Sequence, residues 1–115
     1  MAKTFVEKEQ CTRLRLVNTR ITPIEEGEFV ILGDISGVAL EDVPVGKIGA
    51  FHVEEGIVLQ VSSDDIETGS TFSANGNVRF TSAGKFTSAS GSIVGQVVEP
   101  LTNGVLRFAK FYKAY

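Results

Sequence analysis

The chain has 115 residues, of which 43% are hydrophobic and 22% are charged, and its formal net charge is −3. This length fits a single domain, and this hydrophobic content argues against a disordered chain. One cysteine excludes an internal disulfide framework and a zinc site built from cysteines, and 12 glycines without any tryptophan favour a turn-rich β protein.

Charge is distributed unevenly along the chain. The balance is +3 over residues 1–20, −10 over residues 21–67 and +4 over residues 68–115. The acidic segment disfavours nucleic acid as a partner, although it can equally be a solvated loop surface. No early apolar run and no apolar span of 18 residues exist, so we expect a soluble protein, made in a cytoplasm, without a signal peptide or membrane segment.

The first twenty residues differ from the rest. Residues 12–18 alternate basic and apolar side chains, so a strand would place Arg13 and Arg15 on one face and two leucines on the other. One interpretation is an edge strand of the domain's own sheet, which is slightly favoured for residues 12–18. The other is that residues 1–10 form an extended arm that orders only against a neighbouring chain.

The centre of the chain predicts a β-meander. Four short apolar runs are separated by glycine, proline and acidic residues, which is the pattern of strands and tight turns. No window keeps the i, i+3, i+4 apolar spacing that a helix requires. The four runs cover residues 29–32, 37–40, 48–53 and 57–61.

Turn signals divide the next part of the chain. Asn75-Gly76 predicts a type I′ hairpin turn between a strand at residues 71–73 and another at residues 78–81. The Ser/Thr/Gly-rich residues 81–91 predict an exposed loop or a weak strand around residues 85–87.

Two runs close the chain. Residues 92–98 predict a strand that Pro100 stops. Residues 105–112 carry apolar side chains on both alternating faces, so this strand lies either between two sheets or against another chain.

These patterns together predict an all-β fold. We expect a small β-sandwich or a barrel-like meander of about eight to ten short strands, with no helix. Residues 1–24 would form an extended amino-terminal arm and edge strand, and residues 25–115 would form the β-rich domain.

No catalytic or cofactor site is predicted. Cys11 and His52 are the only cysteine and histidine, and nothing in the sequence supplies a positioned base or an orienting group. Residues 82–87 lack the first glycine and the hydroxyl of a nucleotide-binding loop. The acid pairs match no calcium loop and are interpreted as solvated turn residues; they are Glu41-Asp42, Glu54-Glu55 and Asp64-Asp65.

From residue 30 onward, short motifs occur in an order that resembles one known family, the capsid cement or head-decoration proteins of tailed phages. Members of that family are often labelled as predicted recombinases. Thr71-Phe72 departs from the aromatic pair that relatives often carry there. The matching motifs lie at residues 30–33, 36–40, 42–46, 48–49, 51–56, 65–70, 91–95 and 104–108.

The resemblance implies a non-enzymatic virion protein without cofactors. It implies homotrimers that bind the major capsid protein on the outer capsid surface and stabilise the expanded head, with no nucleic acid or membrane as partner. On this basis we expect capsid contact through Phe5, Val6, Arg13 and Arg15. Some of Phe108, Phe111 and Tyr112 would serve the oligomer interface or core packing.

Two other classes of function stay open. A phage tail or baseplate β-module, or another oligomeric protein-binding module, would share this composition but bind different partners. A small enzyme would need a pocket that converges on His52 or on the acid pairs.

Overall fold

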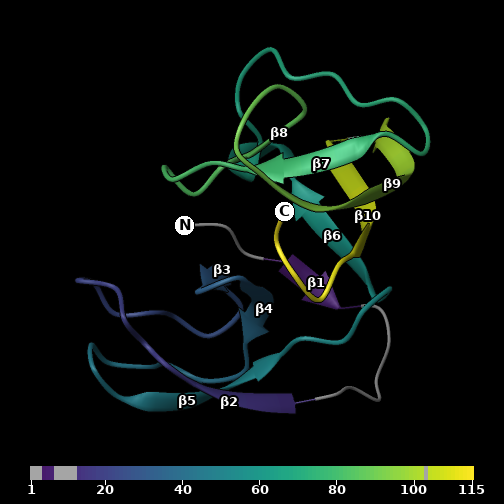
Figure 1. Cartoon of the computed structure of the whole chain (residues 1–115). Helices are drawn as coiled ribbons and strands as arrows, with labels where there is room; N and C mark the ends of the chain where they lie inside the picture. Colours follow the sequence, from purple (N-terminus) through teal and green to yellow (C-terminus); the bar gives the residue numbers. More distant parts are fainter. Residues whose placement is uncertain (1–3, 7–12, 103) are drawn as a thin grey trace.

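The computed structural model describes residues 4–6, 13–102 and 104–115 (Figure 1). Within these residues the protein consists of β-strands and one short 3-10 helix, arranged as two antiparallel sheets. The strand order is β2-β5-β4-β3 in the four-stranded sheet and β1-β6-β10-β9-β7-β8 in the six-stranded sheet. The predicted all-β, sandwich-like fold is therefore confirmed.

The strands are short except for β9. The four-stranded sheet consists of β2 Arg13–Val17, β3 Phe29–Leu32, β4 Ile35–Ala39 and β5 Ile48–His52. The six-stranded sheet consists of β1 Thr4–Val6, β6 Val58–Ser62, β7 Asn77–Phe80, β8 Phe86–Thr87, β9 Ser92–Thr102 and β10 Val105–Lys110. The 3-10 helix η1, Ser63–Asp65, follows β6.

The predicted four-run meander is correct for three runs and wrong for the fourth. Strands β3, β4 and β5 pair in sequence within one sheet, but β6 crosses to the other sheet and pairs with β10. The crossing occurs at Gly56, which has a φ of 82° and whose N–H donates to the carbonyl of Lys110. A turn at this glycine therefore directs the chain onto β10, where Leu59 lies opposite Phe108.

The predicted hairpin at Asn75-Gly76 is wrong. Residues 71–73 form no strand, and the turn is closed by a hydrogen bond from the N–H of Gly76 to the carbonyl of Ser73. Its central residues are Ala74 and Asn75, and only Asn75 has a positive φ. This is the pattern of a type II turn with asparagine in its second central position, so the chain leaves the turn toward β9 instead of folding back on residues 71–73.

Pro100 does not end its strand as predicted. Strand β9 continues through Pro100 to Thr102, and its pairing with β10 shifts register on both sides of Arg107. A β-bulge leaves a residue outside the regular ladder, so a proline without an N–H can be accommodated there.

Phenylalanine side chains fill the space between the two sheets. The ring of Phe29 on the four-stranded sheet lies 4.9 Å from that of Phe80 and 5.2 Å from that of Phe86. The ring of Phe86 in turn lies 5.4 Å from that of Phe108. These tilted and edge-on contacts join β3 to β7, β8 and β10, so the main core holds the two layers together.

A second cluster covers the other face of the four-stranded sheet. It contains Phe51 and Val53 together with Ile24 and Val43, which form an isolated bridge between the two loops that cross this face. The four-stranded sheet is therefore packed on both faces near its centre, in agreement with the continuous apolar runs in its sequence.

Candidate functional site

Strand β2 presents its basic residues to solvent at the edge of the four-stranded sheet. Arg13, Arg15 and Val17 are exposed, and the two leucines between them are half-buried against the second cluster. The predicted alternation and edge position of residues 12–18 are confirmed for residues 13–17. Val17 lies opposite Ile48 of β5, and the two side chains are 44% and 57% exposed.

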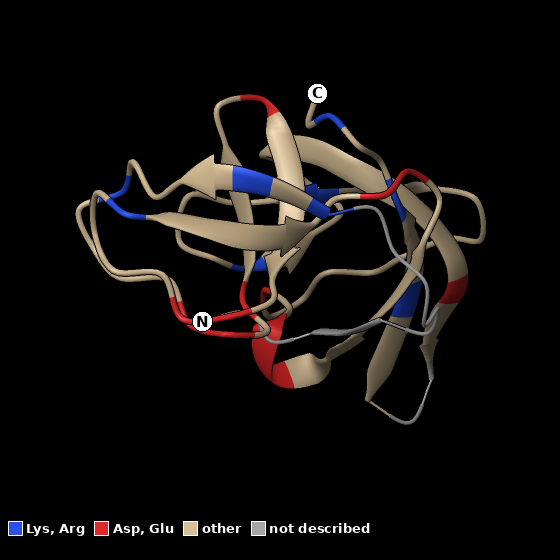
Figure 2. Cartoon of the chain, turned by 90° about the horizontal axis from the view of Figure 1, so that it is seen from below, with Lys and Arg blue, Asp and Glu red and all other residues tan. Residues whose placement is uncertain are grey.

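Residues directly opposite on antiparallel strands share a face of the sheet. The two arginines, Val17 and Ile48 therefore form one exposed surface, which we call the β2 stripe: Arg13, Arg15, Val17 and Ile48. Strand β2 carries Arg13 and Arg15 and no acidic residue, whereas most Asp and Glu residues lie on loops and on η1; Figure 2 colours the basic residues blue and the acidic ones red in a view from below. The β2 stripe thus combines positive charge with apolar area, which suits a protein partner with acidic and apolar groups.

Phe5 and Val6 lie on β1, the edge strand of the six-stranded sheet. Phe5 is opposite Gln60 and Val6 is opposite Leu59 of β6. The backbone of these two residues therefore pairs with the chain's own sheet. The remainder of the expected arm, residues 1–3 and 7–10, lies outside the described residues.

The three aromatic residues expected at an oligomer interface occupy different environments. Phe108 is fully buried in the main core, so its side chain serves packing within the chain. Phe111 and Tyr112 follow β10 and are half-buried, and the ring of Phe111 lies 6.1 Å from that of Tyr115, which is 76% exposed. The surface aromatic group therefore consists of Phe111 and Tyr115, whereas Tyr112 packs against the second cluster.

The candidate catalytic and metal-binding residues are His52, Cys11 and the acid pairs. His52 is buried on β5, and Cys11 lies outside the described residues. Among residues 4–6, 13–102 and 104–115, no three His, Cys, Asp or Glu side chains come together as metal ligands. The described part of the chain also has no helix long and apolar enough to cross a membrane.

Two of the acids predicted to be solvated turn residues, Glu41 and Asp42, are exposed, and their carboxylates also bond to the backbone. A carboxylate oxygen of Glu41 accepts a hydrogen bond from the N–H of Ala50 at 2.9 Å. Asp42 accepts from the N–H of Glu26 at 2.8 Å in the same way. Part of the acidic surface therefore has a structural role.

Lys110 is a fully buried cation that joins the two sheets. Its Nζ lies 2.8 Å from the carbonyl of Ser36 on β4, 3.0 Å from that of Val53 and 2.7 Å from that of Phe111. It also lies 3.2 Å from the hydroxyl of Ser36. Burial lowers the pKa of Lys110 to about 8, and the negative charge of Glu55 acts in the opposite direction.

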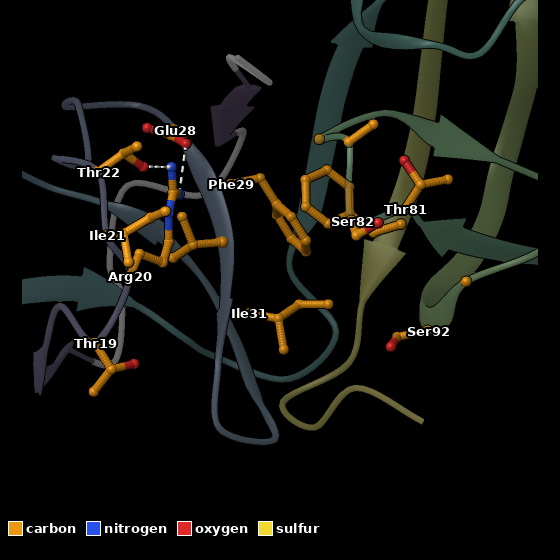
Figure 3. A pocket seen from close by; sticks show the side chains of 15 residues that line it. Thr19, Arg20, Ile21, Thr22, Glu28, Phe29, Ile31, Thr81, Ser82 and Ser92 are labelled. Atoms are coloured by element: carbon orange, nitrogen blue, oxygen red, sulfur yellow. Dashed lines mark hydrogen bonds and ion pairs between the residues drawn. The ribbon is translucent and has the colours of Figure 1, made fainter.

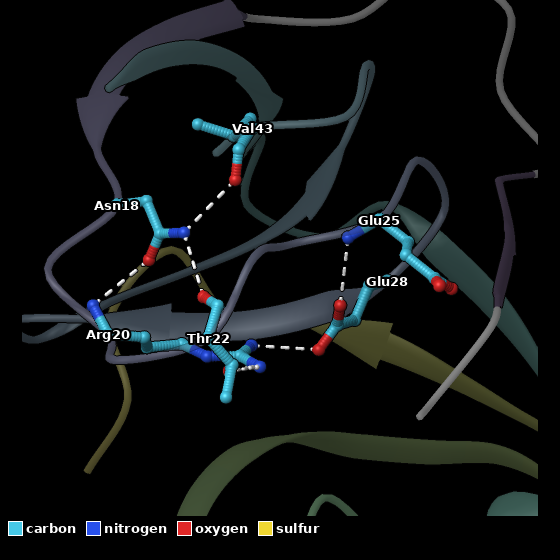
Figure 4. A network of polar contacts seen from close by, with 6 residues as sticks. All are labelled: Asn18, Arg20, Thr22, Glu25, Glu28 and Val43. Carbon is cyan, nitrogen blue, oxygen red and sulfur yellow. Dashed lines mark hydrogen bonds and ion pairs between the residues drawn. The ribbon is translucent and has the colours of Figure 1, made fainter. Parts of the chain in front are cut away.

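A polar network fixes the loop that enters β3. The Nδ2 of buried Asn18 donates to the carbonyls of Thr22 and Val43, both at 3.0 Å, and its Oδ1 accepts from the N–H of Arg20 (Figure 4). Arg20 Nη1 in turn lies 2.7 Å from the buried carboxylate of Glu28. This network holds the segment from residue 18 to residue 22 beside the start of β3.

A groove of about 910 Å³ runs along the outer edge of β3. The loop that carries Arg20 forms one wall, and residues 80–84 and 91–92 of the six-stranded layer form the other (Figure 3). Phe29 and Ile31 point into the space between these walls, and Ile21, which is 95% exposed, lies at the rim.

Sequence reasoning missed both the groove and the buried Lys110. The alternation of residues 106, 108 and 110 on one face of a strand was a usable signal for the inward position of Lys110. No comparable local signal exists for the groove, because its two walls are separated by about 50 residues of sequence.

Comparison with known proteins identifies one family. A family model described as "Phage cement protein" matches residues 8–109, which is most of the chain. Searches of curated proteins and of solved structures find no significant match.

Proposed function

Since the chain belongs to the phage cement protein family, we propose that it binds the outer surface of the capsid as a homotrimer and stabilises the expanded head. The family indicates a structural role in the virion, on the capsid. The partner in this proposal is the major capsid protein, and the role is non-enzymatic.

The β2 stripe supports this proposal best. Its two arginines and two aliphatic side chains are exposed on one sheet, with the aliphatic pair at one end beside the arginines, and apolar area next to charged groups is common at protein interfaces. Arg13 and Arg15 retain their expected role in capsid contact, now together with Val17 and Ile48. Phe5 and Val6 stay as expected contacts, carried by β1 at the edge of the other sheet.

The surface aromatic group is the proposed contact between subunits of the trimer. The rings of Phe111 and Tyr115 contact each other, and Tyr115 exposes most of its surface. Aromatic side chains at a surface supply large contact area at interfaces. We expect Tyr115→Ser to shift the sedimentation coefficient toward that of a monomer.

The proposal is tested by co-sedimentation with capsids that lack this protein. We expect the protein to sediment with expanded capsids and much less with unexpanded ones. The double variant Arg13→Gln, Arg15→Gln should bind more weakly, whereas Lys113→Gln, which removes another exposed cation, should bind like the wild type. Equal binding to both capsid forms, or to neither, would refute the proposed function.

A further inference from the structure

We infer that the groove along β3 receives an extended, uncharged segment of the capsid subunit, which adds a fifth strand to the four-stranded sheet. This inference rests on the proposed function and goes further, because it assigns a mode of recognition and a second contact site. It is carried by the hydrogen-bonding pattern of β3, by the shape of the groove and by the charge of its lining.

The outer edge of β3 has hydrogen-bonding groups that are available to a partner. In an antiparallel pair, residues alternate between positions that bond to the neighbouring strand and positions that do not. The carbonyl of Glu28 accepts a hydrogen bond from the N–H of Ala39. The backbone N–H and C=O groups of Val30 and Leu32, two and four residues further on, therefore also point toward β4. The N–H and C=O groups of Phe29 and Ile31 therefore point away from the sheet.

Ser36 provides an independent check on this register. Ser36 lies opposite Ile31, yet its N–H donates to the carbonyl of Tyr112 and its carbonyl accepts from Lys110. Ser36 and Ile31 thus form a non-bonded pair. Among the described residues, nothing bonds to the backbone groups of Phe29 or Ile31. This edge offers two donors and two acceptors to one added strand.

The shape of the groove restricts what can bind. The β3 edge is recessed between the wall that carries Arg20 and the wall formed by residues 80–84 and 91–92. The β3 edge of a second copy is recessed in the same way, so two copies cannot pair through β3. A single extended segment can enter, because it has no second sheet or loops that would collide with the walls of the groove.

The lining of the groove specifies the chemistry of that segment. Arg20 and Glu28 are the charged residues of the lining, and they are paired with each other at 2.7 Å. The remaining surface consists of apolar side chains, such as Ile31 and Phe80, and of small polar ones. A charged segment would find no opposite charge there, whereas an apolar, strand-forming segment would bury its side chains beside Ile31.

The contact is too small to hold a partner by itself. Strand β3 has four residues, or about 13 Å of edge, and stable independent complexes usually bury at least about 1,200 Å². A weak contact adds more to the overall affinity when a second contact already holds the two proteins together. The β2 stripe would provide that second contact with the same capsid. This favours a capsid segment over a separate soluble partner.

Two pairs of variants test the inference with expanded capsids that lack this protein as the probe. Ser82→Trp fills the groove from the far wall, and Ser88→Trp adds the same side chain at an exposed serine outside the groove. Ile31→Pro removes the outward N–H, and Ile31→Val keeps it. We expect Ser82→Trp and Ile31→Pro to weaken capsid binding on the order of tenfold or more, and both controls to bind like the wild type.

Hydrogen exchange supplies the second measurement. The amides of Phe29 and Ile31 should exchange fast in the unbound protein and should become protected on expanded capsids. This inference would be overturned if Ser82→Trp bound capsids as tightly as the wild type and residues 29–31 of the wild type gained no protection on capsids. The proposed function would then still stand. A variant that changes the sedimentation coefficient of the unbound protein would assign the groove to a second copy, and failure of the wild type to bind would overturn both proposals.

Discussion

Replacing Lys110 by methionine tests how this buried cation responds to pH. The folded protein holds Lys110 with a pKa of about 8, compared with 10.5 for an ordinary lysine. Between these two values the unfolded chain binds more protons than the folded chain, so stability rises as the pH rises through this window. The physical cause is desolvation, because the ammonium is fully buried between the two sheets.

The magnitude follows from the two pKa values. At pH 7 the lowered pKa of Lys110 reduces the free energy of unfolding by nearly its full amount. At pH 10 most of this loss of stability is removed. The gain between these two pH values is on the order of 2–3 kcal/mol, from about 1.4 kcal/mol for each pKa unit. With a urea dependence of about 1–3 kcal/mol per molar, the midpoint should rise by about 1–3 M relative to the variant.

The assay compares urea unfolding of the wild type and of Lys110→Met at several pH values from 7 to 10. Other groups that titrate in this range are common to both proteins, so the difference between the two curves isolates Lys110. Parallel pH profiles would refute the argument, because they would mean that the oxygens around Nζ compensate fully for desolvation of the charge.

Three further predictions follow from the packing and the surface. Gly95→Ala should destabilise the fold by about 2–3 kcal/mol in urea unfolding, since its Cβ would collide with the carbonyl of Ala109; an unchanged midpoint would contradict this packing. Asn18→Ala should cost about 2–3 kcal/mol, because it removes three hydrogen bonds from a buried side chain; a cost near zero would mean that the network is not needed. Deletion of residues 2–10 should abolish capsid binding in co-sedimentation while circular dichroism still shows the β fold; unchanged binding would exclude these residues from capsid contact.

Many strands of this fold were predictable because residues next to them in the sequence mark their boundaries. Residues 29–32 and 48–52 are short apolar runs between glycines, prolines and acids, and each became a strand close to its predicted limits. Alternation in residues 13–17 likewise gave the correct exposed face, because a strand places successive side chains on opposite sides.

Two of the wrong predictions, the fourth strand of the meander and the strand end at Pro100, depend on contacts that are distant in sequence. The crossing of β6 to the second sheet is determined by pairing with β10, which lies about 45 residues further along the chain. The passage of β9 through Pro100 depends on a bulge against the same strand. Local patterns identify which residues form strands, but they do not determine which strands become neighbours.

The candidate surfaces divide in the same way. Arg13 and Arg15 were identified because exposure follows from their alternation with leucines. Alternation assigns Phe108 and Phe111 to opposite faces of one apolar run, but because both faces are apolar the sequence does not show which one is buried; the structure places Phe108 in the core and Phe111 after the end of β10.

The thermal stability of expanded capsids tests the proposed role most directly. Capsids that lack this protein should be heated alone and with increasing amounts of it, and their disruption followed by light scattering. The account predicts that the disruption temperature rises with occupancy and reaches a plateau when the sites are filled. A disruption temperature that does not change when binding is saturated would contradict it.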